Sequence, residues 1–177
     1  SVHRAAMDII EASGSPKTIP CWGFPLSRPL IACSGIMQKL PRILALDSSD
    51  AKSCDAALNE CRDVIEGGGV VIIPTDTVYG LASLSNQPRA VRRIFEIKNR
   101  PLERPLALLV SSRTPPGDYG IEEDTTRRAL LAYWPGPMTI VGPTRTDLPE
   151  GLRGEGNTVG VRSPDHAWVQ RLLDTLP

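Results

Sequence analysis

The stretch VVIIPTDTVYGLA, residues 70–82, indicates the fold class of this 177-residue chain. VVIIP, residues 70–74, is a β-branched run without polar alternation, which is typical of a strand buried on both faces of a sheet. VYGLA, residues 78–82, predicts a second extended segment after a short polar turn. The stretch therefore predicts two strands joined by a short polar turn.

Outward from this stretch, strand and helix patterns alternate. Further strands are expected at 42–46, 105–112, 138–143 and 158–164. Helices are expected from a one-sided apolar stripe at Cys54, Ala57, Leu58, Cys61 and Ile65, from a second stripe at Val91, Ile94 and Phe95 after Pro88, at 122–134, and after Asp165. This alternation predicts an α/β fold, a twisted mixed sheet with flanking helices.

The composition excludes several classes of protein. Lys plus Arg and Asp plus Glu number 20 each, so no net field draws the chain to nucleic acid or membrane. No run approaches the roughly 20 apolar residues of a membrane span. Four cysteines without CxxC spacing and two histidines argue against zinc and for reduced thiols.

Residues 1–41 differ in composition from the domain expected at 42–177, because they are rich in Pro and Ser and contain few acidic residues. They are interpreted as a leader. It is either a transit-like segment, or a disordered extension or the result of a wrongly predicted gene start. The expected location is cytoplasmic, with mitochondrion or plastid as the alternative.

The polar turn carries Thr75, Asp76 and Thr77. Ligands in open α/β sheets bind beyond the carboxyl ends of strands, so these hydroxyls and this carboxylate are candidates for contact with a small ligand. By composition alone, an ordinary turn satisfied by local hydrogen bonds is the better interpretation.

Residues 97–105, IKNRPLERP, hold three cations among two prolines. Lys98 continues the buried stripe of its helix, and Pro101 disfavours helix at Arg100. Lys98, Arg100 and Arg104 can therefore converge on one hollow, where their repulsion requires an anion such as a phosphate chain. A solvated basic loop paired with nearby acids fits about equally well.

Arg162 lies in the expected strand 158–164, pointing opposite to Val159 and Val161. It is a candidate to reach the same hollow and bind a carboxylate, and an exposed strand arginine fits equally well. No phosphate-loop signature and no plausible Ser/His/Asp set is present. His166 is interpreted as a surface or helix-cap residue, not a base.

Four segments, PTDTVYGL, IFEIKNRPLERPLALLV, WPGPMTIV and TVGVRSPDH, together resemble the YrdC family in order and spacing across about residues 43–175. The resemblance implies a twisted α/β sheet with a concave basic face. It also implies threonylcarbamoyl-AMP synthase activity, a nucleotidyltransferase reaction that uses L-threonine, bicarbonate and ATP with Mg2+. The implied partners are tRNA and a tRNA-modifying transferase complex. No association with a membrane is expected.

The same resemblance assigns site residues. Lys98 and Arg100 are implied as catalytic, and Arg100, Arg104 and Val159 as ATP-binding. Thr77 and Arg162 are implied as threonine-binding, and no residue is implied as a metal ligand.

Two alternatives stay open beside this assignment. Because the sequence ends before the family's Ser-x-Asn motif, the domain is expected to be incomplete at its C-terminus and the activity of this chain to depend on that motif. The chain is then alternatively an RNA-binding module, including double-stranded RNA binding, or a catalytically incomplete YrdC-like module. A carbamoyl-adenylate enzyme of the hydrogenase-maturation type is a third interpretation, normally accompanied by zinc-binding domains that are not visible here.

Overall fold

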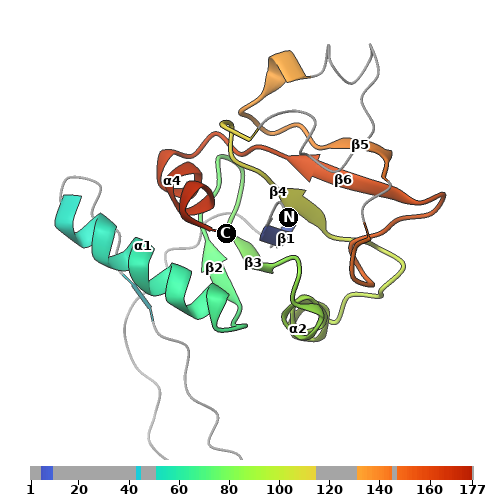
Figure 1. Cartoon of the computed structure of the whole chain (residues 1–177), viewed down its shortest axis with the longest axis horizontal. Helices are drawn as coiled ribbons and strands as arrows, with labels where there is room; N and C mark the ends of the chain where they lie inside the picture. The colour runs from blue at the N-terminus through green and yellow to red at the C-terminus, as the bar shows by residue number, and fades with distance from the viewer. Residues whose placement is uncertain (1–4, 10–42, 45–50, 115–130, 145–146, 177) are drawn as a thin grey trace, which may run out of the picture.

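A mixed β-sheet forms the centre of the computed structural model, which describes residues 5–9, 43–44, 51–114, 131–144 and 147–176 (Figure 1). Within these residues the sheet has six strands in the order β2-β3-β1-β4-β6-β5. The strands are β1 Ala5–Ile9, β2 Val71–Ile73, β3 Gly80–Leu84, β4 Ala107–Leu109, β5 Ile140–Pro143 and β6 Thr158–Arg162.

Only one neighbouring pair of these strands is parallel. β4 and β6 run in the same direction, with Leu108 opposite Val161 and Leu109 opposite Arg162. The other pairs, β2 with β3, β3 with β1, β1 with β4, and β6 with β5, are antiparallel. The prediction of a mixed α/β sheet is confirmed.

Helices cover both faces of the sheet. α1 Ala51–Glu66 and α4 Ala167–Thr175 lie side by side on one face, and α2 Pro88–Lys98 lies on the other (Figure 1). The indole Nε1 of Trp168 donates a hydrogen bond to the carbonyl oxygen of Cys54 at 3.2 Å, which joins α4 to α1.

The strands divide their side chains between two cores because successive residues point to opposite faces. In β3, Leu81 packs in the cluster under α2, while Ala82 and Leu84 pack in the cluster under α1 and α4. In β4, Leu108 and Leu109 divide in the same way. The described residues therefore form three layers, with the sheet between two layers of helices.

Both apolar helix stripes are confirmed. Ala57, Leu58, Cys61 and Ile65 are buried in α1, and Cys54 packs against the same core. Val91, Ile94 and Phe95 are buried in α2. α2 begins with Pro88 in its first turn, and its C-cap is Asn99, whose φ of 49° is left-handed.

One prediction about burial is wrong. VVIIP was expected to be buried on both faces, but β2 is an edge strand and the exposed fraction of Ile72 is 58%. Ile73 is buried in the core under α1 and α4. A β-branched run reports strand propensity equally well at an edge, where one face stays open to water.

Two segments differ from the expected order of elements. Residues 5–9, assigned above to the leader, form β1 between β3 and β4. Residues 43–44, inside the strand expected at 42–46, are not in a strand, and the rest of that segment and of the leader lies outside the described residues. Of the helix expected at 122–134, the described part contains the 3-10 helix η2 Leu131–Tyr133.

Among the described residues, no helix combines the length and the apolar character that crossing a bilayer requires.

Candidate functional site

The turn between β2 and β3 is organised by the hydroxyl of Thr75. Thr75 Oγ1 donates to the carbonyl oxygen of Val78 at 2.6 Å and accepts from the backbone N–H groups of Val78 at 3.1 Å and Thr77 at 3.3 Å. The backbone N–H of Thr75 also donates to Val78 O at 3.0 Å. The prediction of a locally satisfied turn is confirmed for Thr75.

The two hydroxyls of this turn form a directed chain. Thr75 Oγ1 and Thr77 Oγ1 lie 3.1 Å apart. A hydroxyl carries a single proton, and that of Thr75 is engaged by Val78 O. Thr77 must therefore donate to Thr75, which leaves the lone pairs of Thr77 Oγ1 to accept from another group.

That other group is Arg162, at the end of β6. Its Nη1 and Nη2 both donate to Thr77 Oγ1 at 3.2 Å, and Nη2 also donates to Asp76 Oδ1 at 2.6 Å. Nε donates to the carbonyl oxygen of Gly136 at 3.1 Å. One guanidinium thus ties together three segments that are far apart in the sequence.

The Arg162–Asp76 ion pair is poorly solvated. The exposed fraction of the side chain is 2% for Arg162 and 14% for Asp76. The turn itself is open, since residues 76 and 77 are exposed when their main chain is included. A buried guanidinium needs a carboxylate and well-formed hydrogen bonds to offset its desolvation. Arg162 is therefore not an exposed strand arginine.

The segment that follows η2 supplies the main-chain part of this site. Gly136 is buried, and its backbone N–H donates to the carbonyl oxygen of Ser163 at 2.8 Å. The indole of Trp134 donates to the carbonyl oxygen of Met138 at 2.7 Å, which closes the turn around Pro135 and Gly136. These bonds hold the carbonyl oxygen of Gly136 against Arg162.

The basic segment 97–105 forms a second group of candidate residues. Arg100 donates from Nε to the carbonyl oxygen of Arg104 at 2.7 Å and from Nη2 to that of Pro105 at 3.2 Å. Lys98 and Arg100 are half-buried, and Arg104 is exposed. Arg100 therefore shapes the turn that carries Arg104, a role that spacing alone does not predict.

The two groups lie at opposite ends of β4. Arg104 precedes the first residue of β4, whereas Arg162 pairs with its last residue, Leu109. The sequence made Arg162 a candidate to reach the hollow of the basic segment. In the structure its side chain turns instead toward Asp76 and Thr77. A single ligand would have to extend along β4 to meet both groups.

Two further candidates have defined places. Val159 is 1% exposed as a whole residue, and its side chain packs in the core under α2, so neither its side chain nor its main chain offers an open surface to a nucleotide. His166 is the N-cap of α4, and its Nδ1 accepts from the backbone N–H of Val169 at 3.4 Å. The interpretation of His166 as a cap residue is confirmed.

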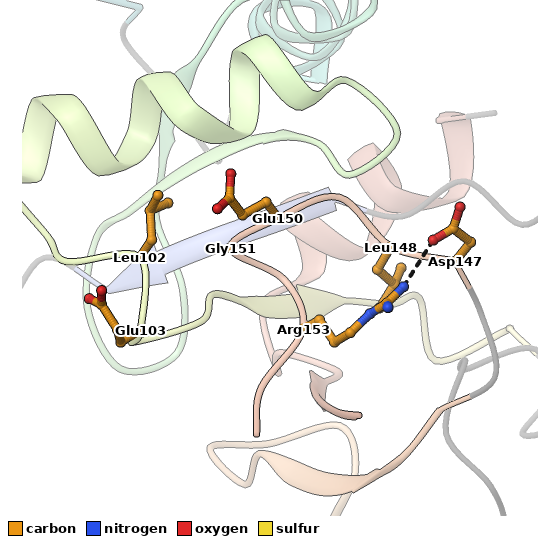
Figure 2. Close-up of a pocket in the computed structure, with 7 residues that line it drawn as sticks. All are labelled: Leu102, Glu103, Asp147, Leu148, Glu150, Gly151 and Arg153. Atoms are coloured by element: carbon orange, nitrogen blue, oxygen red, sulfur yellow. Dashed lines mark hydrogen bonds and ion pairs between the residues drawn. The ribbon is translucent and has the colours of Figure 1, made fainter. Parts of the chain in front are cut away.

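A cavity of about 470 Å3 lies beside the basic segment (Figure 2). Its lining residues are Leu102, Glu103, Asp147, Leu148, Glu150, Gly151 and Arg153. Arg153 donates to Asp147 at 2.9 Å, and Glu150 accepts from Arg92 of α2 at 3.0 Å. The three carboxylates make this cavity unsuited to a phosphate chain, and Lys98, Arg100 and Arg104 are not part of its lining.

Sequence reasoning missed the pairing of Asp76 with Arg162, which are 86 positions apart. It treated Asp76 only as a candidate for contact with a small ligand. One signal pointed to it: Arg162 alternates with buried valines, so its side chain had to face the other side of the sheet. The role of the Gly136 carbonyl group had no signal in the sequence.

Comparison with known proteins gives consistent matches. The family model for Sua5, YciO and YrdC, described as telomere recombination, matches residues 63–177. The threonylcarbamoyl-AMP synthase of Vibrio cholerae serotype O1 is 36% identical over 118 residues, which are 65% of this chain and 63% of that protein. The chain thus spans less than two thirds of this curated relative.

Two solved structures are similar in fold. The crystal structure of P. abyssi Sua5 complexed with L-threonine has a TM-score of 0.61 and 34% identity, covering 68% of this chain and 36% of that one. The crystal structure of E. coli YciO has a TM-score of 0.61 and 25% identity, covering 68% of this chain and 59% of that one.

Proposed function

Because this chain belongs to the Sua5/YciO/YrdC family, we propose that it takes part in the synthesis of threonylcarbamoyl-AMP, the activity for which its curated relatives are named. The proposed substrates are L-threonine, bicarbonate and ATP, and the products are threonylcarbamoyl-adenylate and pyrophosphate. The proposed user of the product is a transferase complex that modifies tRNA.

The contact of Arg162 with Thr77 is the single observation that carries this proposal. Both residues are implied as threonine-binding, and the fold brings them within 3.2 Å although they are 85 positions apart. An arginine can donate a charge-assisted hydrogen bond to a carboxylate. A hydroxyl beside it suits the side chain of a hydroxylated amino acid.

The phosphate end of the proposed substrate path is the basic segment. Lys98 supplies a point charge and Arg104 a forked donor on an exposed turn. Arg100 holds that turn through the carbonyl oxygens of Arg104 and Pro105. In this proposal threonine lies near one end of β4 and the outer phosphates lie near the other.

The chemistry requires positioning more than covalent help. The amine of threonine attacks bicarbonate with loss of water, or CO2 with loss of a proton, to give a carbamate. A carbamate oxygen then attacks the α-phosphorus of ATP, from which pyrophosphate leaves. Phosphoryl-group chemistry of this kind depends on alignment and charge neutralisation.

ATP is proposed to enter as its Mg2+ complex, because Mg2+ is usually held by substrate phosphates and one or two carboxylates. In the described residues no three or more His, Cys, Asp or Glu side chains gather into a metal-binding group.

The test is release of pyrophosphate from ATP by the purified chain, with and without threonine and bicarbonate. We expect release only when both are present. Serine and valine are matched controls, since serine lacks the methyl group of threonine and valine lacks its hydroxyl. Release that is independent of threonine would reject the proposed function.

A further inference from the structure

Asp76 and Arg162 form a neutral pair at the proposed seat of threonine. Asp76 Oδ1 lies 2.6 Å from Arg162 Nη2, and both side chains are largely shielded from water. Charges interact more strongly in such surroundings than in bulk solvent. Asp76 therefore sets the net charge that an incoming ligand meets.

The hydrogen bonds of Arg162 leave a defined position for a ligand. A guanidinium has five N–H groups. Among the described residues, Nε is engaged by Gly136, one N–H of Nη1 by Thr77, and Nη2 by Asp76 and Thr77. The second N–H of Nη1 has no acceptor among these residues, so a carboxylate that reaches this side chain, which is 2% exposed, can bond there.

Asp76 has a matching position for a cation. In the part of the chain that the structure describes, its carboxylate accepts through Oδ1 from Arg162, and Oδ2 has no hydrogen-bond donor of its own. The main chain of the turn is exposed, so a ligand can approach from solvent. The site thus holds one donor for a carboxylate and one acceptor for an ammonium group.

We propose that Asp76 makes this site select a zwitterionic α-amino acid over a carboxylate that lacks an amine. The inference rests on the proposed function, because it takes Arg162 and Thr77 as the seat of threonine. A zwitterion places its ammonium group beside Asp76 and keeps the net charge at zero. A plain carboxylate adds a negative charge next to Asp76, and this repulsion disfavours it.

The proposal differs from a purely structural role for Asp76. A structural ion pair would stabilise the fold and leave the relative affinities of two small ligands unchanged. Charge selection changes that ratio in a predictable direction when the carboxylate is neutralised. The ratio of affinities is therefore the decisive quantity.

The experiment measures binding of L-threonine and of 3-hydroxybutyrate, the same skeleton without the amine, by calorimetry. We expect the wild-type chain to bind threonine at least about ten-fold more tightly, the equivalent of one charge-assisted hydrogen bond. Asp76→Asn should reduce that ratio to about three-fold or less. Asp147→Asn is the matched control, because Asp147 is exposed and pairs with Arg153, and it should keep the wild-type ratio.

Three outcomes would overturn the inference: equal binding of both ligands to the wild type, no binding of threonine to it, or a folded Asp76→Asn that keeps the wild-type ratio. If Asp76→Asn does not fold, Asp76→Glu decides, since it retains the charge. A folded Asp76→Glu that has lost selection counts against the proposal, and one that retains it supports the proposal.

The measurements keep the two proposals apart. Selective binding of threonine without threonine-dependent pyrophosphate release rejects the proposed function and leaves charge selection standing. Threonine-dependent pyrophosphate release, together with an unchanged ratio of affinities in Asp76→Asn, supports the proposed function and rejects charge selection by Asp76.

Discussion

Arg100 holds the main chain of Arg104, with its Nε 2.7 Å from the carbonyl oxygen four residues further on. The same guanidinium donates from Nη2 to the carbonyl oxygen of Pro105. A positive charge implied as catalytic is thus also the clamp of the turn that presents its neighbour. Substitution of Arg100 can separate the effect of its charge from the effect of its hydrogen bonds to the main chain.

Arg100→Lys should impair ATP use much more than Arg104→Lys. Lysine keeps the charge but lacks the planar fork that reaches two carbonyl oxygens. We expect KM for ATP to rise about ten-fold or more in Arg100→Lys, the equivalent of one such hydrogen bond, and to change little in Arg104→Lys. Steady-state kinetics at varied ATP decides. Equal effects of the two substitutions would show that Arg100 acts by charge alone.

Arg162→Ala should lower the free energy of unfolding by about 3 kcal/mol, because it leaves the carboxylate of Asp76 shielded and without its partner. Urea unfolding followed by circular dichroism measures this loss. The double variant Asp76→Ala, Arg162→Ala should lose less than the sum of the two single variants, since neither charge is then left alone. Additive losses would contradict the interaction.

Thr75→Val should loosen the turn between β2 and β3. The substitution keeps the shape of the side chain but removes one donated and two accepted local hydrogen bonds, a loss of about 1–3 kcal/mol. It also removes the acceptor of the Thr77 hydroxyl. We expect lower stability together with weaker threonine binding, both measurable by thermal unfolding with and without threonine.

Trp168→Phe provides a contrast, because it affects packing away from both candidate groups. It removes the hydrogen bond to the carbonyl oxygen of Cys54 and should lower stability by about 1 kcal/mol. Pyrophosphate release at a temperature where the variant is folded should match that of the wild type. A large loss of activity would mean that the α1–α4 contact shapes the site.

Cys61 should make stability depend on pH in the alkaline range. Burial, and next the negative charge of Glu60, raise the pKa of the Cys61 thiol above its ordinary value of 9.0. As pH rises through 9.0, the thiol ionises in the unfolded chain before it does so in the folded protein, so stability falls.

The measurement for Cys61 is urea unfolding at pH 7 and pH 10. The wild type should lose more stability between these values than Cys61→Ala does. Between pH 6 and pH 7, below the ordinary pKa, the two proteins should respond alike. A parallel loss in both proteins up to pH 10 would show that other groups cause the pH dependence.

Much of the architecture follows from local patterns in the sequence. The stripe Val91, Ile94 and Phe95 identifies the buried face of α2, because residues three and four positions apart share one side of a helix. The runs at 138–143 and 158–164 contain β5 and β6. The motifs also identify Thr77 and Arg162 as candidate site residues. The comparisons confirm the family that those motifs resemble.

Other features depend on contacts that no local pattern encodes. A β-branched run does not indicate whether its strand lies in the centre or at the edge of a sheet. β2 lies at the edge, and Ile72 in it is exposed. The segment 5–9 has no marked strand pattern, yet it pairs with both β3 and β4. Pairing of this kind depends on contacts between strands that are far apart in the sequence.

The sequence by itself determined the class of fold, the helical faces and the residue types of the candidate site, since these follow from side-chain spacing along a regular backbone. Only the tertiary structure decided which groups meet. It set Asp76 against Arg162 across 86 positions and turned the guanidinium of Arg100 onto its own main chain. Such partners depend on strand order and on the path of the turns, which are properties of the whole folded chain.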